Sequence, residues 1–212
     1  MNSLWKLIAR VITRNPSTVD WIIRRAMRTP YTHITSADGK SIYMGRWWLF
    51  NPYTRRSDGE QGAARFAWLP SVRIHHICRP DQDRDLHDHP WNARTIILDG
   101  WYREERPAIA CSDEDTLHQS IRFKLYKREY LAELLRQTGY TGRLKFGEYH
   151  RISEVSAGGV WTIFITGRKR GTWGFMVKGK KVPWRTYLGL DKKPEATDTN
   201  NKTTTADQGA TA

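Results

Sequence analysis

Short runs of apolar and aromatic residues dominate the chain and predict β-strands. Runs of this kind lie at residues 41–50, 66–69, 72–78, 95–99, 144–152, 160–166 and 173–177. Glycine pairs such as Gly158 and Gly159 separate some of them, which is typical of tight turns between strands. Many short strands around one core favour a mainly β fold of the jelly-roll barrel type.

Helical spacing replaces this pattern near the N-terminus. Apolar residues recur every three or four positions over residues 2–28 and predict two helices separated at residues 15–16. Basic residues lie on the other helix faces, so the helices could touch a membrane or nucleic acid. The alternative is a helical appendage packed on the barrel or on a second subunit. We favour the appendage, because Trp21, Ile22 and Ile23 need cover.

Two further segments depart from the strand pattern. Residues 107–141 lack short strands, and the spacing of leucines in residues 129–137 predicts a helix, so we expect a helical insertion in the barrel. The C-terminal residues contain no aromatic side chain and no aliphatic one larger than alanine, which is typical of disorder. The expected organisation is a helical segment (1–29), a β-barrel (30–190) and a disordered tail (191–212).

Three histidines occupy positions from which they could converge. His87 and His89 are two residues apart, so an extended strand would direct both side chains to the same face. A returning strand could bring His150 to the same point. Neutral imidazoles bind first-row divalent ions, so these three residues are the candidate metal ligands, with open positions for water, oxygen or substrate.

Longer motifs surround these histidines and carry a family resemblance. They are H-D-H-P-W at residues 87–91, I-I-L-D-G-W-Y at 96–102, H-R-I at 150–152 and W-T-I-F-I-T-G-R at 161–168. Together they resemble the cupin superfamily, and most closely its small uncharacterised members from bacteriophages and bacteria. The resemblance covers roughly residues 31–188. It implies a jelly-roll barrel that holds a divalent ion (Fe, Zn, Mn or Ni).

One departure from the cupin pattern concerns the fourth ligand. The first cupin motif usually carries a glutamate four or five residues after its second histidine, where this chain has Ala93 and Arg94. The resemblance therefore implies a three-histidine site, as in the thiol dioxygenase branch of the superfamily. Glu104 or Glu105 could also substitute, and the sequence leaves open which of the two faces inward.

Other polar residues near the motifs are candidates for acid–base or substrate-orienting roles. Proximity in sequence selects Tyr102, Glu104, Tyr149 and Arg151. His75 and His76 point to opposite faces of one strand, so at most one of them can face the barrel interior. The acids of residues 81–85 could orient ligand histidines, but we favour a solvated loop for them.

Charge adds an expectation about partners. The formal net charge is +13, which favours anionic partners such as nucleic acid, nucleotides or phosphorylated sugars. No acid occurs between residues 155 and 190, and aromatic residues interleave with the basic ones there. Single-stranded nucleic acid binders use this combination, which makes Arg168, Lys169 and Arg170 candidate contacts. The alternative is a solvated rim with ordinary core tryptophans.

The two cysteines lack C-x-x-C spacing, which fits a reducing cytoplasm, or the host cytoplasm if the protein is encoded by a phage. No apolar run has the length of a membrane span. A homo-oligomer is compatible with the sequence.

Two functions follow from these observations. In the first, the chain is a metal-dependent enzyme, similar to a dioxygenase or an isomerase or epimerase, that acts on a small anionic substrate. In the second, it is a non-catalytic binding or regulatory cupin whose basic surface contacts nucleic acid or a protein. Cupins include both kinds of protein, so the resemblance leaves the chemistry open.

Overall fold

The computed structural model describes residues 2–36, 39–55, 61–81, 85–108, 121–126 and 129–191. Apart from Asp191, the predicted tail lies outside the described residues, as does most of the segment between residues 109 and 128. The prediction that the tail is disordered therefore stays a prediction.

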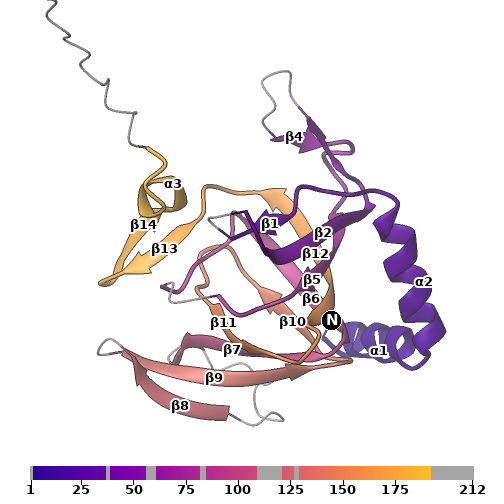
Figure 1. Ribbon diagram of the computed structural model, residues 1–212, viewed down its shortest axis with the longest axis horizontal. Coiled ribbons are helices and arrows are strands. Elements are labelled where there is room, and N and C mark those ends of the chain that lie inside the picture. Colours follow the sequence, from indigo (N-terminus) through magenta and orange to yellow (C-terminus); the bar gives the residue numbers. More distant parts are fainter. Residues whose placement is uncertain are drawn as a thin grey trace, which may run out of the picture.

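Antiparallel strands form most of the described chain, and two helices precede them (Figure 1). The helices are α1 (Asn2–Thr13), α2 (Pro16–Met27) and the short α3 (Trp184–Tyr187). The first strands are β1 (Ile34–Thr35), β2 (Ile42–Phe50), β3 (Tyr53–Arg55), β4 (Gln61–Ala64), β5 (Ser71–Ile77), β6 (Trp91–Asp99) and β7 (Trp101–Pro107). The later ones are β8 (Ile121–Tyr126), β9 (Glu129–Gln137), β10 (Thr141–Leu144), β11 (Arg151–Val155), β12 (Val160–Lys169), β13 (Gly174–Val177) and β14 (Lys180–Pro183).

A six-stranded sheet with the order β1-β2-β5-β12-β6-β10 is buried on both of its faces. Adjacent residues of β6 show this, because side chains alternate between the faces of a strand. Ile96 packs with α1 and α2 on the outer face. Ile97 packs on the inner face, in a cluster with Tyr102 and Ile152 of the second sheet. The two sheets therefore face each other across an apolar layer.

The second sheet has the order β11-β7-β9-β8, and the chain passes repeatedly between the two sheets. β6 leads to β7, β10 to β11, and β11 to β12, each time in the opposite sheet. The backbone of His87 extends the second sheet, since it bridges His150 on one side and Phe175 of β13 on the other. Alternation between two facing antiparallel sheets is the jelly-roll arrangement, so the predicted fold class is confirmed.

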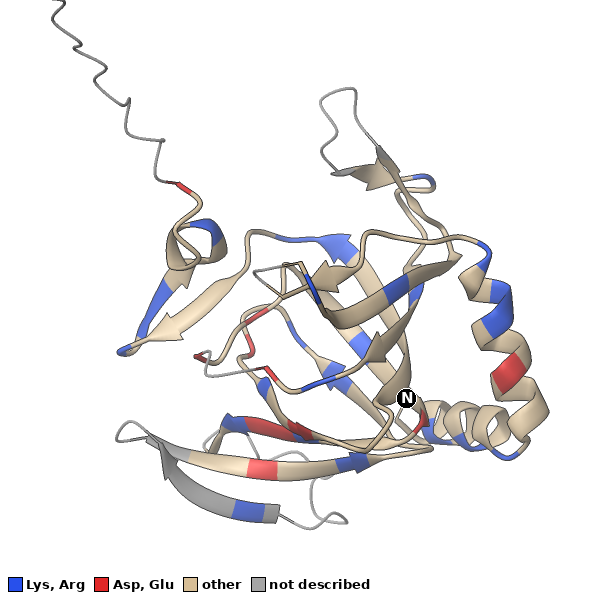
Figure 2. Ribbon diagram, viewed as in Figure 1, with Lys and Arg blue, Asp and Glu red and all other residues tan. Residues whose placement is uncertain are grey.

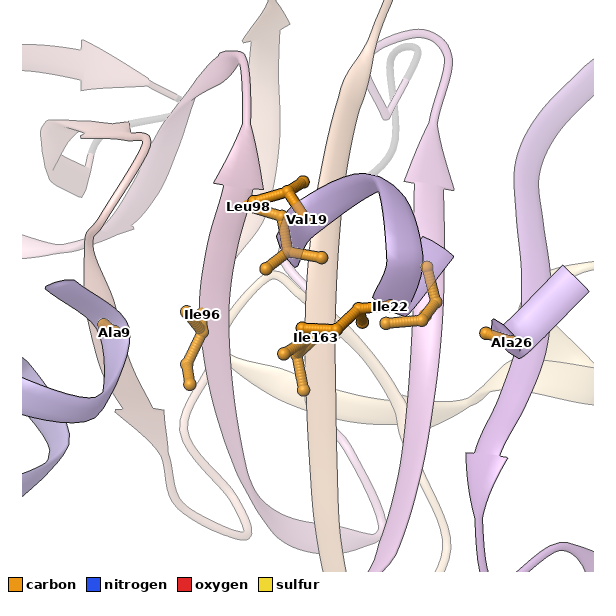
Figure 3. Close-up of a cluster of buried hydrophobic side chains, with 8 residues drawn as sticks. Ala9, Val19, Ile22, Ala26, Ile96, Leu98 and Ile163 are labelled. Carbon is orange, nitrogen blue, oxygen red and sulfur yellow. The ribbon is translucent and has the colours of Figure 1, made fainter. Parts of the chain in front are cut away.

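Both N-terminal helices lie where the apolar spacing predicted them, and they cover the outer face of the six-stranded sheet. Asn15 caps α2, because its side-chain oxygen accepts a hydrogen bond from the Ser17 N–H at 2.9 Å. Figure 3 shows Val19 and Ile22 of α2 directed at side chains of β6 and β12. The helices are thus part of the core, which agrees with the appendage interpretation.

The helix predicted at residues 129–137 is wrong, and most of the remaining insertion lies outside the described residues. Residues 129–137 form β9, which pairs with β7 from Gln137 opposite Trp101 to Leu131 opposite Pro107. β8 pairs with its other edge. A leucine-rich segment has good helix propensity, but two neighbouring strands supply a complete backbone ladder and bury Leu131 and Leu134. Tertiary pairing therefore overrides the local preference.

The structure also differs from the prediction at three shorter segments. Residues 66–69 form a turn rather than a strand, and the expected strand at 144–152 is divided by a turn between β10 and β11. The polar segment at 51–63, expected to be a loop, contains the short hairpin of β3 and β4.

None of the helices in the described part of the chain has the length and apolar character needed to span a bilayer.

We expect the packing of α2 to contribute measurably to stability. Ile22 is 8% exposed and packs on the sheet, whereas its neighbour Trp21 is 66% exposed. Ile22→Ala should lower the free energy of unfolding by about 2–4 kcal/mol, because it leaves a cavity under the helix. The matched change Trp21→Ala should cost about 0.5 kcal/mol in urea denaturation. Equal losses for the two variants would contradict this packing.

Candidate metal centre

The three predicted ligand histidines come together beside β11, at one edge of the second sheet. His87 is fixed by backbone hydrogen bonds in both directions with His150, at 2.9 and 3.0 Å. His89 follows two residues later, immediately before β6 begins. One nitrogen of each ring belongs to a group whose ligand atoms all lie within 4.8 Å of one another. The convergence predicted from their positions in the sequence is therefore present in the structure.

The separation of the ring nitrogens suits a shared ion. His89 Nε2 and His150 Nε2 are 3.0 Å apart. Two imidazole nitrogens that bind one ion at about 2.0–2.1 Å lie about 3–3.5 Å from each other. The side chains of His87 and His150 are 16% and 13% exposed, so solvent reaches the group. Its geometry thus fits a small divalent cation.

Glu104 of β7 fixes the orientation of His150. Its carboxylate accepts a hydrogen bond from His150 Nδ1 at 2.9 Å, and Arg106 and Arg136 each donate to it at 2.9 Å. With the proton on Nδ1, His150 Nε2 keeps its lone pair for a metal. Glu104 therefore faces inward, but it contacts a ligand histidine rather than joining the ligand atoms as a fourth member.

The charge of Glu104 is secured by its two arginines. Burial by itself would raise the pKa of Glu104, but Arg106, Arg136 and the hydrogen bond with His150 outweigh it and hold that pKa well below its usual range. Among the described residues, Glu104 is thus an ionised carboxylate buried beside the metal centre. Such a group fixes the tautomer and the orientation of the imidazole to which it is bonded.

Asp81 faces the third predicted ligand histidine, and the expectation of a solvated loop is wrong for the two described acids of this loop, Asp81 and Asp85, which are both buried. The carboxylate of Asp81 is buried and lies 4.0 Å from His87 Nδ1. It accepts hydrogen bonds from the Tyr43 hydroxyl and from the Ile152 N–H. These bonds tie the end of β5 to β2 and β11, and they hold the Asp81 carboxylate next to His87. The described parts of the 81–85 loop are therefore structural.

Asp88, between the two motif histidines, points away from them. It is fully buried and accepts hydrogen bonds from the Gly174 N–H at 2.8 Å and from Lys181 Nζ at 2.5 Å. Since side chains alternate along an extended segment, anchoring Asp88 to β13 and β14 directs its neighbours His87 and His89 to the opposite side.

The ring of His89 is held in its neutral form. Desolvation, followed by the neighbouring His150 and His87, lowers the pKa of His89 well below its usual range. Only an unprotonated imidazole nitrogen can bind a metal, so this shift keeps His89 available at neutral pH.

The remaining candidate catalytic residues, Tyr102, Tyr149 and Arg151, lie in three different environments. Tyr102 is buried in the apolar layer between the sheets, where burial and then the charge of Glu104 raise its pKa. Desolvation and Asp88 raise the pKa of the half-buried Tyr149 to about 12. Arg151 is buried and pairs with Glu105 at 2.5 Å. Of the four candidates, Glu104 is the one that the structure bonds to a ligand histidine.

His75 and His76 point to opposite faces of β5, as predicted. His75 lies inside the barrel against Phe164, with ring centroids 4.9 Å apart. His76 stacks on Trp161 of the outer face, at a centroid distance of 4.1 Å. His76 therefore cannot replace a missing ligand.

Arg106 and Arg136 are two residues of the candidate site that the sequence analysis did not select. Arg106 was detectable, because residues 102, 104 and 106 share one face of β7. Arg136 was not, since it lies opposite Tyr102 in β9, a segment predicted to be helical. Only the pairing of β9 with β7 brings this guanidinium to Glu104.

The candidate nucleic-acid contacts lie at the end of β12. Arg168, Lys169 and Arg170 are all exposed, and Figure 2 shows basic residues again on β14 and α3. Beside them lies a cavity of about 480 Å³, lined by Arg143, Lys145, Arg170 and Phe146. The structure thus places an accessible aromatic ring among cations.

No known protein family matches the sequence, and no curated protein is significantly similar to it. Three solved variants of oxalate decarboxylase from Bacillus subtilis resemble its backbone, with TM-scores of 0.42, 0.43 and 0.42 at 12%, 11% and 12% identity. The matches cover 79%, 78% and 79% of this chain but only 33% of each decarboxylase chain. Another similar structure concerns the Mn(II) centres of that enzyme. Likeness this weak does not decide the chemistry of this chain.

Replacing Glu104 should affect both stability and metal binding. Glu104→Gln leaves Arg106 and Arg136 without their shared carboxylate, so the free energy of unfolding should fall by about 3 kcal/mol at pH 7. Metal affinity should fall about 10–100-fold, because His150 loses its anionic partner. Titration calorimetry with Zn²⁺ and urea denaturation measure the two effects.

The matched control is Glu154→Gln, which removes an exposed carboxylate bonded to Arg103 and should cost less than about 1 kcal/mol. The lowered pKa of Glu104 also sets the pH range of its effect. Its contribution is complete above the ordinary carboxyl pKa of about 4.3 and disappears as pH falls through the lower folded value. An unchanged Zn²⁺ affinity in Glu104→Gln would contradict the orienting role.

Proposed function

We propose that this chain is a cupin-type metal-binding protein in which His87, His89 and His150 hold one divalent ion. The observation that supports this most strongly is the group of three imidazole nitrogens within 4.8 Å of one another, with Glu104 bonded to the remote nitrogen of one of them. A metal-bound histidine usually donates its other N–H to a carboxylate or carbonyl. His150 makes this bond, and Asp81 lies behind His87.

We further propose that the site belongs to an enzyme, similar to a dioxygenase or to an isomerase or epimerase, that acts on a small anionic substrate. Three neutral histidines add no negative charge, so the ion keeps its full positive charge and attracts anions. A bound Fe, Zn, Mn or Ni ion would supply Lewis acidity or oxygen chemistry. The chain itself contributes the fixed proton on His150 Nδ1, held by Glu104, and partial shelter from water.

A screen of small anionic metabolites tests the enzymatic function. Ligands that bind the folded state raise the melting temperature in proportion to the logarithm of their concentration over Kd. An anion that stabilises the metal-loaded protein more than the chelated protein would support a substrate site at the metal.

Metal retention tests the ligand set. His87→Ala, His89→Ala and His150→Ala should each lower metal content sharply, because each removes one of three protein ligands. Binding should also weaken as pH falls below about 6.5, since protons compete for the same nitrogens. Elemental analysis after dialysis at several pH values measures both effects.

His76→Ala is the matched control, because its ring lies on the outer face of the six-stranded sheet. It should retain metal at the wild-type level. Full retention in a protein that carries both His87→Ala and His89→Ala would overturn the proposed centre.

The second candidate function is binding of single-stranded nucleic acid at the end of β12. The specific observation is Phe146, 39% exposed and set among Arg143, Lys145 and Arg170. Aromatic rings stack on bases while cations neutralise phosphates, and together these contacts tolerate many sequences. This surface lies outside the histidine group, so it could accompany a metal centre.

Salt dependence tests this second function. Binding of a fluorescent oligonucleotide should weaken linearly in a plot of log affinity against log salt. Exchanging Arg168, Lys169 and Arg170 for Gln should reduce the slope by about 2 for single strands, because each neutralised phosphate contributes roughly 0.7. Phe146→Ala should lower affinity with little change in slope. Absence of binding at low salt would remove this function.

A further inference from the structure

Arg73 is an arginine in the barrel interior surrounded by aromatic rings. It lies on the inner face of β5 and is 2% exposed. Its guanidinium carbon lies between 4.8 and 6.0 Å from five ring centroids. These rings belong to Tyr31, Trp48, Tyr53, Trp91 and Phe164. Such rings stabilise a cation through their faces, but they accept no strong hydrogen bonds from it.

The hydrogen-bonding capacity of this group is largely unused by the protein. Arg73 donates to Thr166 Oγ1 at 3.3 Å, while its Nε has no partner. Trp91 Nε1 and His75 Nε2 are also buried without a protein partner. A guanidinium has five N–H groups, and buried donors are normally satisfied. These three nitrogens without a protein partner belong to residues of one ring cluster and point to an acceptor that the protein does not supply.

The charge of Arg73 also points to an acceptor that the protein does not supply. Among the described residues, no carboxylate forms an ion pair with Arg73. A second guanidinium, that of Arg46, lies close by on the neighbouring strand, where residue 46 is directly opposite His75. Desolvation by burial lowers the pKa of Arg46 to about 10, and the charge of Arg73 acts in the same direction. A buried charge such as that of Arg73 is costly without a counter-ion, and the half-buried Arg46 adds charge of the same sign.

The cationic group adjoins the metal centre. The ring centroid of Phe164 lies 4.9 Å from that of His75 and 5.7 Å from that of His89. The rings of Trp91 and His89 stack at 6.0 Å. A small molecule bound to Arg73 would therefore lie beside a ligand histidine, on the inner face of the six-stranded sheet.

We propose that Arg73, assisted by Trp91 Nε1–H and His75, binds the carboxylate of a small organic acid inside the barrel. The inference rests on the proposed function, because this acid would be the anionic ligand presented to the metal. A planar guanidinium matches a carboxylate with two parallel hydrogen bonds. The flat aromatic walls favour a planar carboxylate over a tetrahedral phosphate or sulfate, which the test includes as competitors.

The test measures binding of acetate, formate and malonate by thermal shift and calorimetry, with chloride, sulfate and phosphate at equal ionic strength. The full chain is used after chelation and again after loading with Zn²⁺. At least one carboxylate should raise the melting temperature in both forms, and sulfate and phosphate should not. Arg73→Gln should weaken that carboxylate about 100-fold and Trp91→Phe about tenfold, through loss of charged and neutral hydrogen bonds.

Stability in carboxylate-free buffer separates this role from a structural one. Arg73→Gln should melt at the same temperature as the wild type or higher, because it removes an uncompensated buried charge. If Arg73→Gln melts lower in every buffer or fails to fold, Trp91→Phe decides, because it keeps an aromatic ring and removes the N–H donor. An unchanged carboxylate response in Trp91→Phe would then overturn the inference.

Arg94→Gln is the matched control. Arg94 is also a buried arginine of this sheet, but it lies on the outer face, over Trp5 and bonded to Thr141. Its carboxylate response should equal that of the wild type. Equal stabilisation of wild type and Arg73→Gln, an equal response to sulfate or phosphate, or no carboxylate response would each overturn the proposal.

The two proposals fail separately. If the wild type binds Zn²⁺ through its histidines but no carboxylate, only the carboxylate site is wrong. If a protein with both His87→Ala and His89→Ala keeps its metal while Arg73→Gln still abolishes the carboxylate response, only the three-histidine centre is wrong.

Discussion

The structure depends on a six-stranded sheet that is buried on both faces. Because side chains alternate along each strand, every strand supplies one set of residues to the helices and another to the barrel interior. The outer set is apolar, as Ile74, Ile96 and Ile163 show, and α1 and α2 cover it. That cover allows the inner face to carry polar residues without losing the core that stabilises the sheet. The N-terminal helices thus support the site without touching it.

The buried polar residues of the interior are organised as two contrasting groups. Around Glu104, one carboxylate accepts hydrogen bonds from Arg106, Arg136 and His150, so opposite charges are paired and His150 has a defined tautomer. Around Arg73, positive charge and unused donors accumulate against aromatic rings. The histidine group lies between these two environments. One side orients the proposed ligands of the metal, and the other favours an anion beside it.

This contrast relates the two candidate functions to different parts of the molecule. The histidines and Arg73 are in the interior, where a small anion is the natural partner. The cations near Phe146 are on the surface, where a polyanion could lie. Neither arrangement requires the other. The net charge of +13 therefore does not indicate a single kind of partner, because some of the basic side chains are buried and others are exposed.

The sequence by itself determined the mainly β fold, the two N-terminal helices and the three histidines, because each follows from the periodicity of neighbouring residues or from a compact motif. His87 and His89 converge since they are two positions apart, and H-R-I resembles the second half of the same motif. Pairing between distant segments carries no such local signal. Only the tertiary structure made residues 129–137 a strand, brought Arg136 to Glu104, placed Asp81 behind His87 and enclosed Arg73 in aromatic rings. In each case the energy comes from interactions between residues far apart in the chain, which the pattern along it does not record.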